Sequence, residues 1–490
     1  MSQLVFVGVI ASARSLKELN AFTGYLSVES GVITSIGTKE ELDNQKNKFK
    51  DFKFIQLKSN QFLMPGLIDC HTHAPQFPNI GLGLDRPLLE WLDKYTFPLE
   101  SQYSNIDFAS RVYDTVVQRL LINGTTTACY FGSLHKEGCL ELAKSAIKYK
   151  QRALVGKVSM NVENNIGYYN DTQTELMQTE EYIQSVLEFK SELVHPIVTP
   201  RFAVSCDHEL MCGLSKIAQK YNCRIQSHVS ENTKEIEHVL KTFPECTTYS
   251  HVYDQCGILT KKCIMAHAVY LSKKEMELFA CKGVSVAHCP ASNTRLRSGL
   301  CPVKRLIDNG VTVGLGTDVS GGDSATILDA MRRAMDVSTH LELLGHEEAI
   351  NWKEAFYLAT LGGAKALNLD EKIGNFAIGK EFDALVVDAY SKNGPTDDYV
   401  YPLPADDEEH ILNILQRFLY VGDDRNIVQP CEVLTRAVAS RTGVGSGGHF
   451  TRLESERDFS FGVRERTAHA SAPRTSPRTA TLAACAGGPC

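Results

Sequence analysis

Short apolar runs alternate with amphipathic segments over most of the chain. Eight runs of strand length occur at 62–69, 125–131, 153–160, 194–200, 224–228, 263–267, 284–288 and 311–318. Runs that are apolar throughout are typical of parallel strands, whose two faces are both covered. Between them, apolar residues recur at three- and four-residue spacing, which predicts helices at 106–122, 138–149, 175–192, 208–221, 234–242, 273–281 and 303–309. The pattern therefore predicts an α/β fold, a TIM-type (β/α)8 barrel.

The segments on either side of the predicted barrel have a different pattern. Residues 1–61 alternate apolar runs with turn signals, which predicts a small antiparallel sheet. After expected helices at 328–337 and 352–366, the run 373–388 has turn glycines and a strand at 384–387, and 411–421 is a further helix or strand. We expect this strand to pair with the N-terminal sheet. The predicted organisation is a catalytic barrel at 62–366 and a small β-sandwich domain built from 1–61 and 367–428.

The last segment, 429–490, differs in composition from the rest. It holds eight arginines and no lysine, is rich in small residues and has no apolar periodicity. Such a stretch cannot bury enough surface to offset its chain entropy, so we expect disorder. The change of composition suggests a foreign coding origin, a hypothesis that transcript sequencing tests.

Residue types that bind metals lie at the ends of the predicted strands. Two histidines two positions apart on a strand point the same way, so both imidazoles can reach one ion. In barrel enzymes the carboxyl ends of the strands carry the active site, because the loops converge there. The sequence therefore predicts a divalent metal site from five histidines and one aspartate so placed: His71, His73, His228, His267, His288 and Asp318.

Net charge, cysteine spacing and the length of the apolar runs limit the kinds of partner that the chain can have. The formal net charge of −7 argues against a large nucleic-acid footprint. The 15 cysteines form no C-x-x-C pair, which favours reduced thiols in the cytoplasm. No run approaches the roughly 20 apolar residues that span a bilayer. We expect a small-molecule substrate, with neither nucleic acid nor membrane as a partner.

With these residues in view, the chain resembles the amidohydrolase superfamily of metal hydrolases. The motifs are PGLIDCHTH at 65–73, HVSE at 228–231, His267, AHCP at 287–290, GLGTD at 314–318 and GKEFDALVVD at 379–388. A narrower resemblance, to the guanine deaminases within it, comes from PLLEWLDKYTFP at 87–98, GTTTACYF at 124–131, VTPRF at 198–202 and YVGDDRNI at 420–427. The resemblance covers roughly residues 1–428 and implies a homodimer that hydrolyses guanine to xanthine and ammonia.

The same resemblance implies one zinc ion per subunit. Its ligands are His71, His73, His228 and Asp318, and His267 lies beside the ion as a hydrogen-bond partner of the attacking water. A second ion would need a bridging lysine, and the matching position reads Thr199-Pro200-Arg201. We expect Lys157, the nearest alternative, to pack or to form a salt bridge instead.

Further residues carry the expected reaction and the purine. Glu231 is the expected acid and base, with Asp318 as the group that accepts the water's proton; the alternative for Glu231 is a glutamate that stabilises a helix N-terminus. Gln76, Arg201 and Phe202 are expected to bind the purine, together with His228, Glu231 and Asp318. Arg201 can hold a carbonyl oxygen or form a structural salt bridge, and Gln76 offers both a donor and an acceptor. Trp91 and Phe97 either cover the pocket or pack in the core.

Two other readings stay open. Another aminohydrolase of the superfamily, acting on cytosine, a triazine or an adenosine derivative, would keep the metal residues and change Gln76, Arg201 and Phe202. A non-catalytic scaffold that retains the barrel would have lost ligands, and none is missing.

Overall fold

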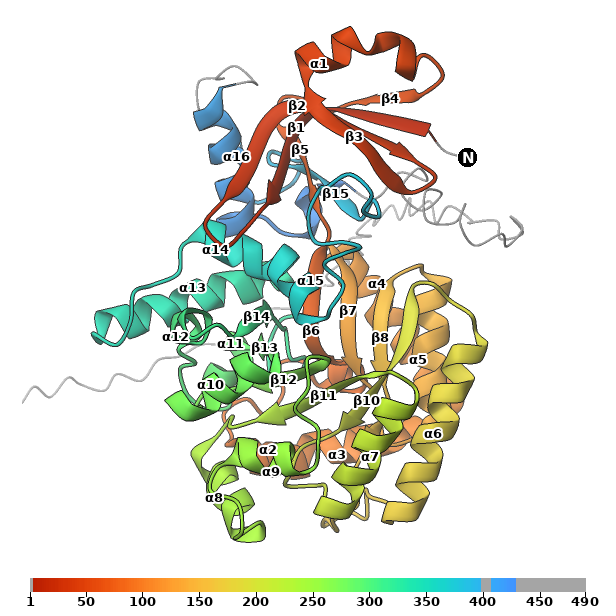
Figure 1. The fold of residues 1–490 in the computed structure, drawn as a ribbon, viewed down its shortest axis with the longest axis vertical. Helices are drawn as coiled ribbons and strands as arrows, with labels where there is room; N and C mark the ends of the chain where they lie inside the picture. The colour runs from red at the N-terminus through yellow and green to blue at the C-terminus, as the bar shows by residue number, and fades with distance from the viewer. Residues whose placement is uncertain (1–2, 398–406, 429–490) are drawn as a thin grey trace, which may run out of the picture. The chain divides into compact units, whose positions relative to one another are not determined.

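The computed structural model describes residues 3–397 and 407–428 of the 490-residue chain. The prediction of a disordered tail at 429–490 lies outside the described residues. Within them, the strands form two sheets, one parallel and one mixed (Figure 1). No described helix has the length and apolar character needed to cross a membrane.

The parallel sheet is the predicted barrel, and the fold prediction is confirmed. Its order is β14-β13-β12-β11-β10-β8-β7-β6, with β9 pairing with β10 beyond the end of β8. Past the end of β14, two backbone hydrogen bonds join the last strand position to the first: the Asp318 amide donates to the His71 carbonyl at 2.8 Å, and the His73 amide donates to the Val319 carbonyl at 3.1 Å. The strands are β6 Leu67–His73, β7 Thr125–Phe131, β8 Arg152–Gly156, β9 Val158–Ser159, β10 Val194–Pro200, β11 Arg224–Val229, β12 Cys263–His267, β13 Ser285–His288 and β14 Thr312–Leu315.

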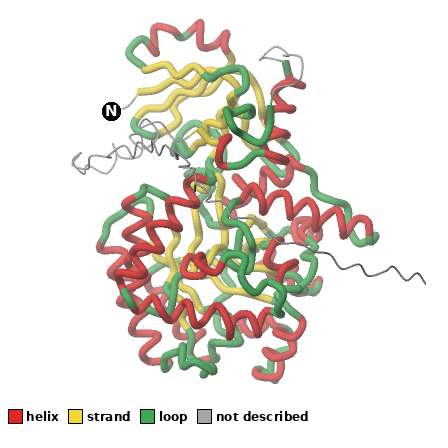
Figure 2. Tube along the Cα trace, turned by 180° about the vertical axis from the view of Figure 1, so that it is seen from behind, coloured by secondary structure: helices red, strands yellow, loops and turns green. Residues whose placement is uncertain are grey.

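Helices surround these strands, as the view from behind makes plain (Figure 2). The apolar stripe of α4 faces inward, with Val116, Val117 and Leu120 buried, and the Asn105 side chain caps its first turn by accepting from the Phe108 amide. The long helices are α4 Ile106–Ile122, α5 Lys136–Lys148, α6 Thr172–Glu188, α7 His208–Lys220, α8 Thr233–Thr242, α10 Lys273–Lys282 and α13 Ile327–Leu343. Shorter ones are α9 Tyr249–Gln255, α11 Pro290–Arg295, α12 Val303–Asp308, and α14 Trp352–Tyr357, which continues through a π-helical turn into α15 Gly363–Ala366.

The loop after β6 is long and has its own short helices. They are a 3-10 helix at Ala74–Asn79, α2 Leu88–Trp91, a π-helical turn at Leu92–Thr96, α3 Phe97–Glu100 and a second 3-10 helix at Ser101–Ser104. These turns carry several side chains into the pocket described below.

The mixed sheet joins segments from the two ends of the described chain. Its strands are β1 Gln3–Ala13, β2 Leu19–Glu29, β3 Val32–Thr38, β4 Lys53–Gln56, β5 Gln61–Pro65, β15 Ala384–Asp388 and β16 Ile427–Val428. β15 pairs antiparallel with β5, as the predicted return strand requires. β1 to β3 are antiparallel as expected, but β4 and β5 run parallel to β1, so the prediction of a purely antiparallel N-terminal sheet was wrong. The connection through α1 (Lys39–Asn44) and a 3-10 turn (Lys46–Phe49) returns the chain to the other side of β1, so that β4 runs in the same direction as β3.

The predicted first barrel strand, 62–69, is in fact two strands in different sheets. β5 ends at Pro65 and β6 begins at Leu67, and the amide of Gly66 between them donates to the Asp383 carbonyl at 3.1 Å. A Cβ at Gly66 would lie 1.9 Å from the Thr126 hydroxyl oxygen, so only glycine fits this crossing. The apolar run is continuous because both strands are buried, which hides the change of sheet. The segment 411–421, predicted as helix or strand, is the helix α16 (Glu408–Val421), and its Phe418 ring packs on Phe62.

Candidate active site

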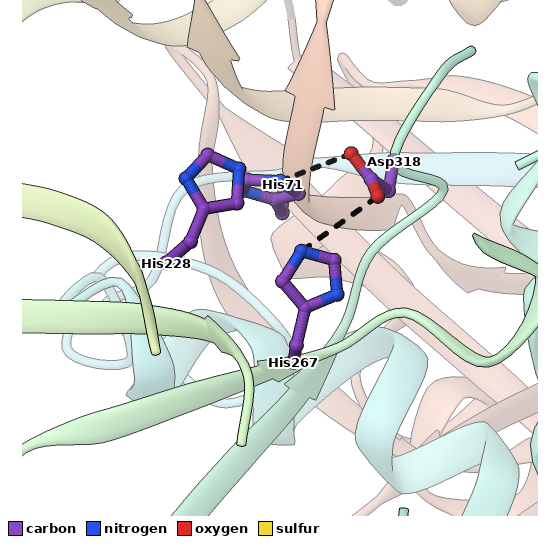
Figure 3. Close-up of side chains that lie close together, drawn as sticks. All are labelled: His71, His228, His267 and Asp318. Carbon is purple, nitrogen blue, oxygen red and sulfur yellow. Dashed lines mark ion pairs between the residues drawn. The ribbon is translucent and has the colours of Figure 1, made fainter. Parts of the chain in front are cut away.

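Side chains from four strand ends converge at the mouth of the barrel. His71 lies near the end of β6, His228 and His267 lie on β11 and β12, and Asp318 follows β14 (Figure 3). One ligand atom from each lies within 4.8 Å of the others, and all four residues are buried. The Asp318 carboxylate lies between two histidines, with Oδ1 at 3.1 Å from His71 Nε2 and Oδ2 at 3.8 Å from His267 Nε2.

His73 reaches the same place from the end of β6. Its Nε2 lies 3.1 Å from His228 Nε2 and 3.4 Å from Asp318 Oδ1. Five of the six side chains predicted at the metal site therefore converge, all but His288, although they are separated by up to about 250 residues in the chain. His267 Nε2 lies 3.8 Å from Asp318 Oδ2, a separation that two ligands of one ion can also have. The distances therefore do not distinguish a ligand from a hydrogen-bond partner of the water, and the predicted role of His267 beside the ion stays a prediction.

The protonation of these rings suits a metal site. The Nδ1 atom of His228 lies 2.6 Å from the Arg201 carbonyl oxygen, which can only accept, so Nδ1 carries the hydrogen and Nε2 presents a lone pair. Burial, and then the neighbouring imidazoles, hold the pKa of His73 and of His228 well below the ordinary value. His71 Nε2 is buried and lies 3.1 Å from Asp318 Oδ1. Neutral imidazoles with one carboxylate are a donor set that fits a divalent ion such as zinc.

The Asp69 side chain, on β6, links that strand to the segment that follows β14. Its carboxylate accepts from the backbone amides of His71 at 3.2 Å and Thr317 at 3.1 Å, and from the Thr317 hydroxyl. Burial raises the pKa of Asp69 to about 7, although the Thr317 hydrogen bonds oppose that rise. Asp69 was not predicted from the sequence; its signal is an acidic side chain inside an otherwise apolar strand.

Glu231 lies just before helix α8, whose N-cap is Asn232, and faces His267. Its Oε2 is 3.4 Å from His267 Nε2, and its Oε1 accepts from the Ser298 hydroxyl at 2.8 Å. Burial raises the pKa of Glu231. Burial lowers the pKa of His267, but the carboxylates of Glu231 and Asp318 outweigh it and leave that pKa above the ordinary value.

The N-terminus of α8 is stabilised by Glu235 and not by Glu231, for which this role was the alternative. Glu235 completes the capping box of α8, and its Oε2 accepts from the amides of Glu231 and Asn232 at 3.0 and 3.1 Å. The sequence analysis missed Glu235. It also missed Asn293, whose Oδ1 lies 2.8 Å from His267 Nδ1 and sets the orientation of that ring.

A pocket opens beside the cluster and brings the expected substrate residues together. All six predicted residues line it: Gln76, Arg201, Phe202, His228, Glu231 and Asp318. Trp91 and three leucines form the apolar part of the wall, so Trp91 does face the pocket. Phe97 is buried behind it, with its ring 5.0 Å from the Arg201 guanidinium.

A buried carboxylate that the sequence analysis missed holds two of these residues. Glu100 Oε2 accepts from Arg201 Nη1 at 2.6 Å, and Glu100 Oε1 accepts from Arg201 Nη2 at 3.0 Å and from Gln76 Nε2 at 2.9 Å. The Gln76 oxygen accepts from the Ser320 amide at 3.2 Å. Arg201 thus forms the structural ion pair that was its alternative role, and it lines the pocket as well. The signal for Glu100 was its place two residues after the motif at 87–98.

Two further sequence expectations concern buried residues near the site. Lys157 forms a salt bridge with Glu175 at 2.7 Å, both side chains being fully buried, which confirms that expectation. His288 is buried with neither ring nitrogen hydrogen-bonded, burial lowers its pKa to about 3, and it does not line the pocket.

Comparison with known proteins gives the class of the fold and site. Residues 62–430 match the model of the amidohydrolase family, and the chain belongs to that family. Within it, the chain groups with guanine deaminases. It is 47% identical to the guanine deaminase of Mus musculus over 381 residues, covering 77% of this chain and 83% of the mouse protein. It is 34% identical to that of Escherichia coli K12 over 406 residues, covering 82% and 88%.

A solved structure extends the likeness to three dimensions. The crystal structure of guanine deaminase from C. acetobutylicum, with bound guanine in its active site, matches with a TM-score of 0.79 and 35% identity. The match covers 87% of this chain and 98% of that one.

Proposed function

We propose that this chain catalyses the hydrolytic deamination of guanine to xanthine and ammonia. The observation that carries the proposal is one cavity lined by the histidine–aspartate cluster, by the buried acid Glu231 and by the pair Gln76 and Arg201. Its relatives named guanine deaminase, one of them solved with guanine in its active site, support the same reaction.

The proposal includes one zinc ion per chain, held by His71, His73, His228 and Asp318. Support comes from the lone pair of His228, the buried Nε2 of His71 and the short distances to the Asp318 carboxylate. When bound at such a site, zinc would lower the pKa of a water to about 7 and so supply a nucleophile at neutral pH.

The chain's own residues then move the protons. Glu231, whose pKa is raised by burial, donates a proton to the ring nitrogen next to C2 while water oxygen bonds to C2. Asp318 accepts the proton of the attacking water. As the bond from C2 to the amino nitrogen breaks, that proton passes to the amine, which leaves as ammonia. The proton of the new C2 hydroxyl passes to Glu231, which forms the C2 carbonyl of xanthine and restores the acid. His267, between the two carboxylates, orients the water and holds both acids in place.

Recognition of the purine falls to residues on two loops. Gln76 and Arg201 keep N–H groups beyond those given to Glu100, and these can donate to the carbonyl oxygen of guanine. Phe202 offers an aromatic face to the planar base. We further propose a homodimer in the cytoplasm, which the family resemblance and the free thiols of all described cysteines support.

A panel of purines and pyrimidines tests this function. The full-length protein, loaded with zinc, is incubated with guanine, adenine, cytosine, adenosine and a triazine, and ammonia release is measured. We expect guanine to be the preferred substrate and xanthine to be the product. Preferential release from any other member of the panel, or no release from guanine, would overturn the proposal.

A further inference from the structure

A second group of metal-binding side chains lies where the helices α7 and α9 meet. It consists of His208, Cys212 and Cys256, and it shares no residue with the histidine–aspartate cluster. One ligand atom from each lies within 4.8 Å of the others. The motifs and the proposed reaction account for none of the three.

The backbone places these side chains together without any ligand. His208 is the first residue of α7 and Cys212 lies one turn later, so both project from the same face. Cys256 is the C-cap of α9, and Gly257 follows it with φ of +73°, a conformation that suits glycine and turns the chain. The Ser215 hydroxyl on α7 donates to the Gly257 carbonyl at 2.8 Å. The spacing of the two helices is therefore fixed at this point.

The separation between the Cys212 sulfur and the His208 ring is close to that of two ligands of one tetrahedral ion. With zinc–sulfur and zinc–nitrogen bonds of about 2.3 and 2.05 Å, a tetrahedral angle separates sulfur and nitrogen by about 3.6 Å. The Cys212 sulfur lies 3.7 Å from each ring nitrogen of His208. The His208 side chain is exposed, so the ring can turn to aim either nitrogen at an ion.

The exposure and the chemical type of the three side chains favour a soft divalent ion that keeps a water ligand. Cys256 is buried, Cys212 is half-buried and His208 is exposed, which leaves one side open for water as a fourth ligand. Thiolate and imidazole select zinc and similar soft ions over calcium and magnesium.

We propose that His208, Cys212 and Cys256 bind a thiophilic divalent ion of the zinc class, separate from the ion of the active site. The ion ties the start of α7 to the end of α9. Each helix is joined to a segment that lines the pocket. α7 follows the segment with Arg201 and Phe202, and the Tyr253 hydroxyl on α9 donates to the His228 carbonyl at 2.7 Å. The role of the ion is to brace these helices, not to take part in the reaction.

Cadmium is the probe, because cadmium bound to thiolate has an ultraviolet charge-transfer absorption. The proposed active-site ligands are nitrogen and oxygen only, so this absorption is silent about that site and does not depend on the proposed function. The reduced, chelator-treated full-length chain is titrated with Cd²⁺. We expect an absorption whose amplitude at saturation corresponds to one thiolate-bound ion per chain, in addition to any silent ion at the active site, and which is lost in Cys212→Ser.

Two further variants make the result decisive. His208→Ala changes an exposed residue and should leave the fold intact, yet weaken cadmium binding by more than the roughly 10- to 100-fold that loss of an outer partner costs. Cys223→Ser changes another half-buried cysteine outside the group and should leave the absorption unchanged. Absent absorption in the unmodified protein, or full absorption in Cys212→Ser, would overturn the site. So would an unchanged affinity in His208→Ala.

Discussion

Glu100 is a residue whose replacement should change how the site recognises guanine without touching the reacting atoms. Its carboxylate is fully buried and makes three hydrogen bonds, two to Arg201 and one to Gln76. Glu100→Gln keeps the size of the side chain but removes its charge. One acceptor oxygen must then serve three donors, and the guanidinium is left without its counter-charge. Glu100 is therefore a positioning residue that acts through two others.

The structure gives the size of the effect. Removing one partner of a buried ion pair costs about 3–5 kcal/mol, which should appear as a lower free energy of unfolding. Gln76 and Arg201 would also regain side-chain freedom, worth up to about 1.5–2 kcal/mol each, which guanine must remove again when it binds. Together this amounts to about 3–4 kcal/mol, or a fall in kcat/KM of roughly 10²- to 10³-fold. Most of that fall should appear in KM.

The assay compares two ligands that differ at the edge these residues face. 2-Aminopurine keeps the amino group of guanine but lacks the carbonyl oxygen. In Glu100→Gln, KM for guanine should rise far more than the inhibition constant of 2-aminopurine does, while bound zinc stays at the level of the unmodified protein. If KM for guanine and the inhibition constant of 2-aminopurine rose by the same factor, Glu100 would have only a structural role. An unchanged KM for guanine would refute the reasoning.

Glu175→Gln is the matched control for that experiment. Glu175 forms an equally buried ion pair with Lys157, at 2.7 Å with both side chains fully buried, and neither residue lines the pocket. We expect a comparable loss of stability, about 3–5 kcal/mol, with an unchanged preference for guanine over 2-aminopurine. The contrast between the two variants separates positioning from general destabilisation.

Three other outcomes follow from the site. Glu231→Gln should retain zinc while lowering kcat by about 10²- to 10⁴-fold, measured as ammonia release; near-normal turnover would remove Glu231 from the mechanism. Chelation should abolish the activity and lower the melting temperature, and added zinc should restore both; activity that survives complete metal removal would contradict the site. Burial raises the pKa of Glu235 from 4.5 to about 7, so its stabilising contribution is complete below pH 4.5 and lost as the pH rises through 7. Urea titrations should show that the free energy of unfolding of Glu235→Gln changes less between pH 4.5 and 7 than that of the unmodified protein.

The sequence was most informative where local patterns decide the structure. The strands at 125–131, 194–200 and 263–267 and the helix at 106–122 end where the prediction put them. An apolar run closed by a polar residue marks a barrel strand end directly. The run at 62–69 failed, because burial on both sides of Gly66 leaves no sign that the chain changes sheets.

The ligand residues and the residues that hold them differ in how visible they are in the sequence. The spacing of His71 and His73 and the strand-end positions of His228 and Asp318 follow from strand geometry. Glu100 ends a one-turn helix in an irregular loop, and Asn293 lies on the short α11, so no period connects either to its partner. Such contacts depend on where distant loops meet, which tertiary structure alone determines.

The groups proposed for the reaction and those proposed to bind the base lie on different parts of the fold, which bears on the choice of substrate. The groups proposed to move protons and hold the ion sit on or next to strand ends, which the hydrogen bonds of the barrel fix in place. The groups proposed to hold the base come from the loop after β6, which supplies Gln76 and Glu100, and from the turn after β10, which supplies Arg201. Loops tolerate sequence change that a closed sheet does not. A relative with the same metal residues can therefore act on a different ring once these two loops differ, and the trio of Glu100, Gln76 and Arg201 is where preference for guanine should be sought.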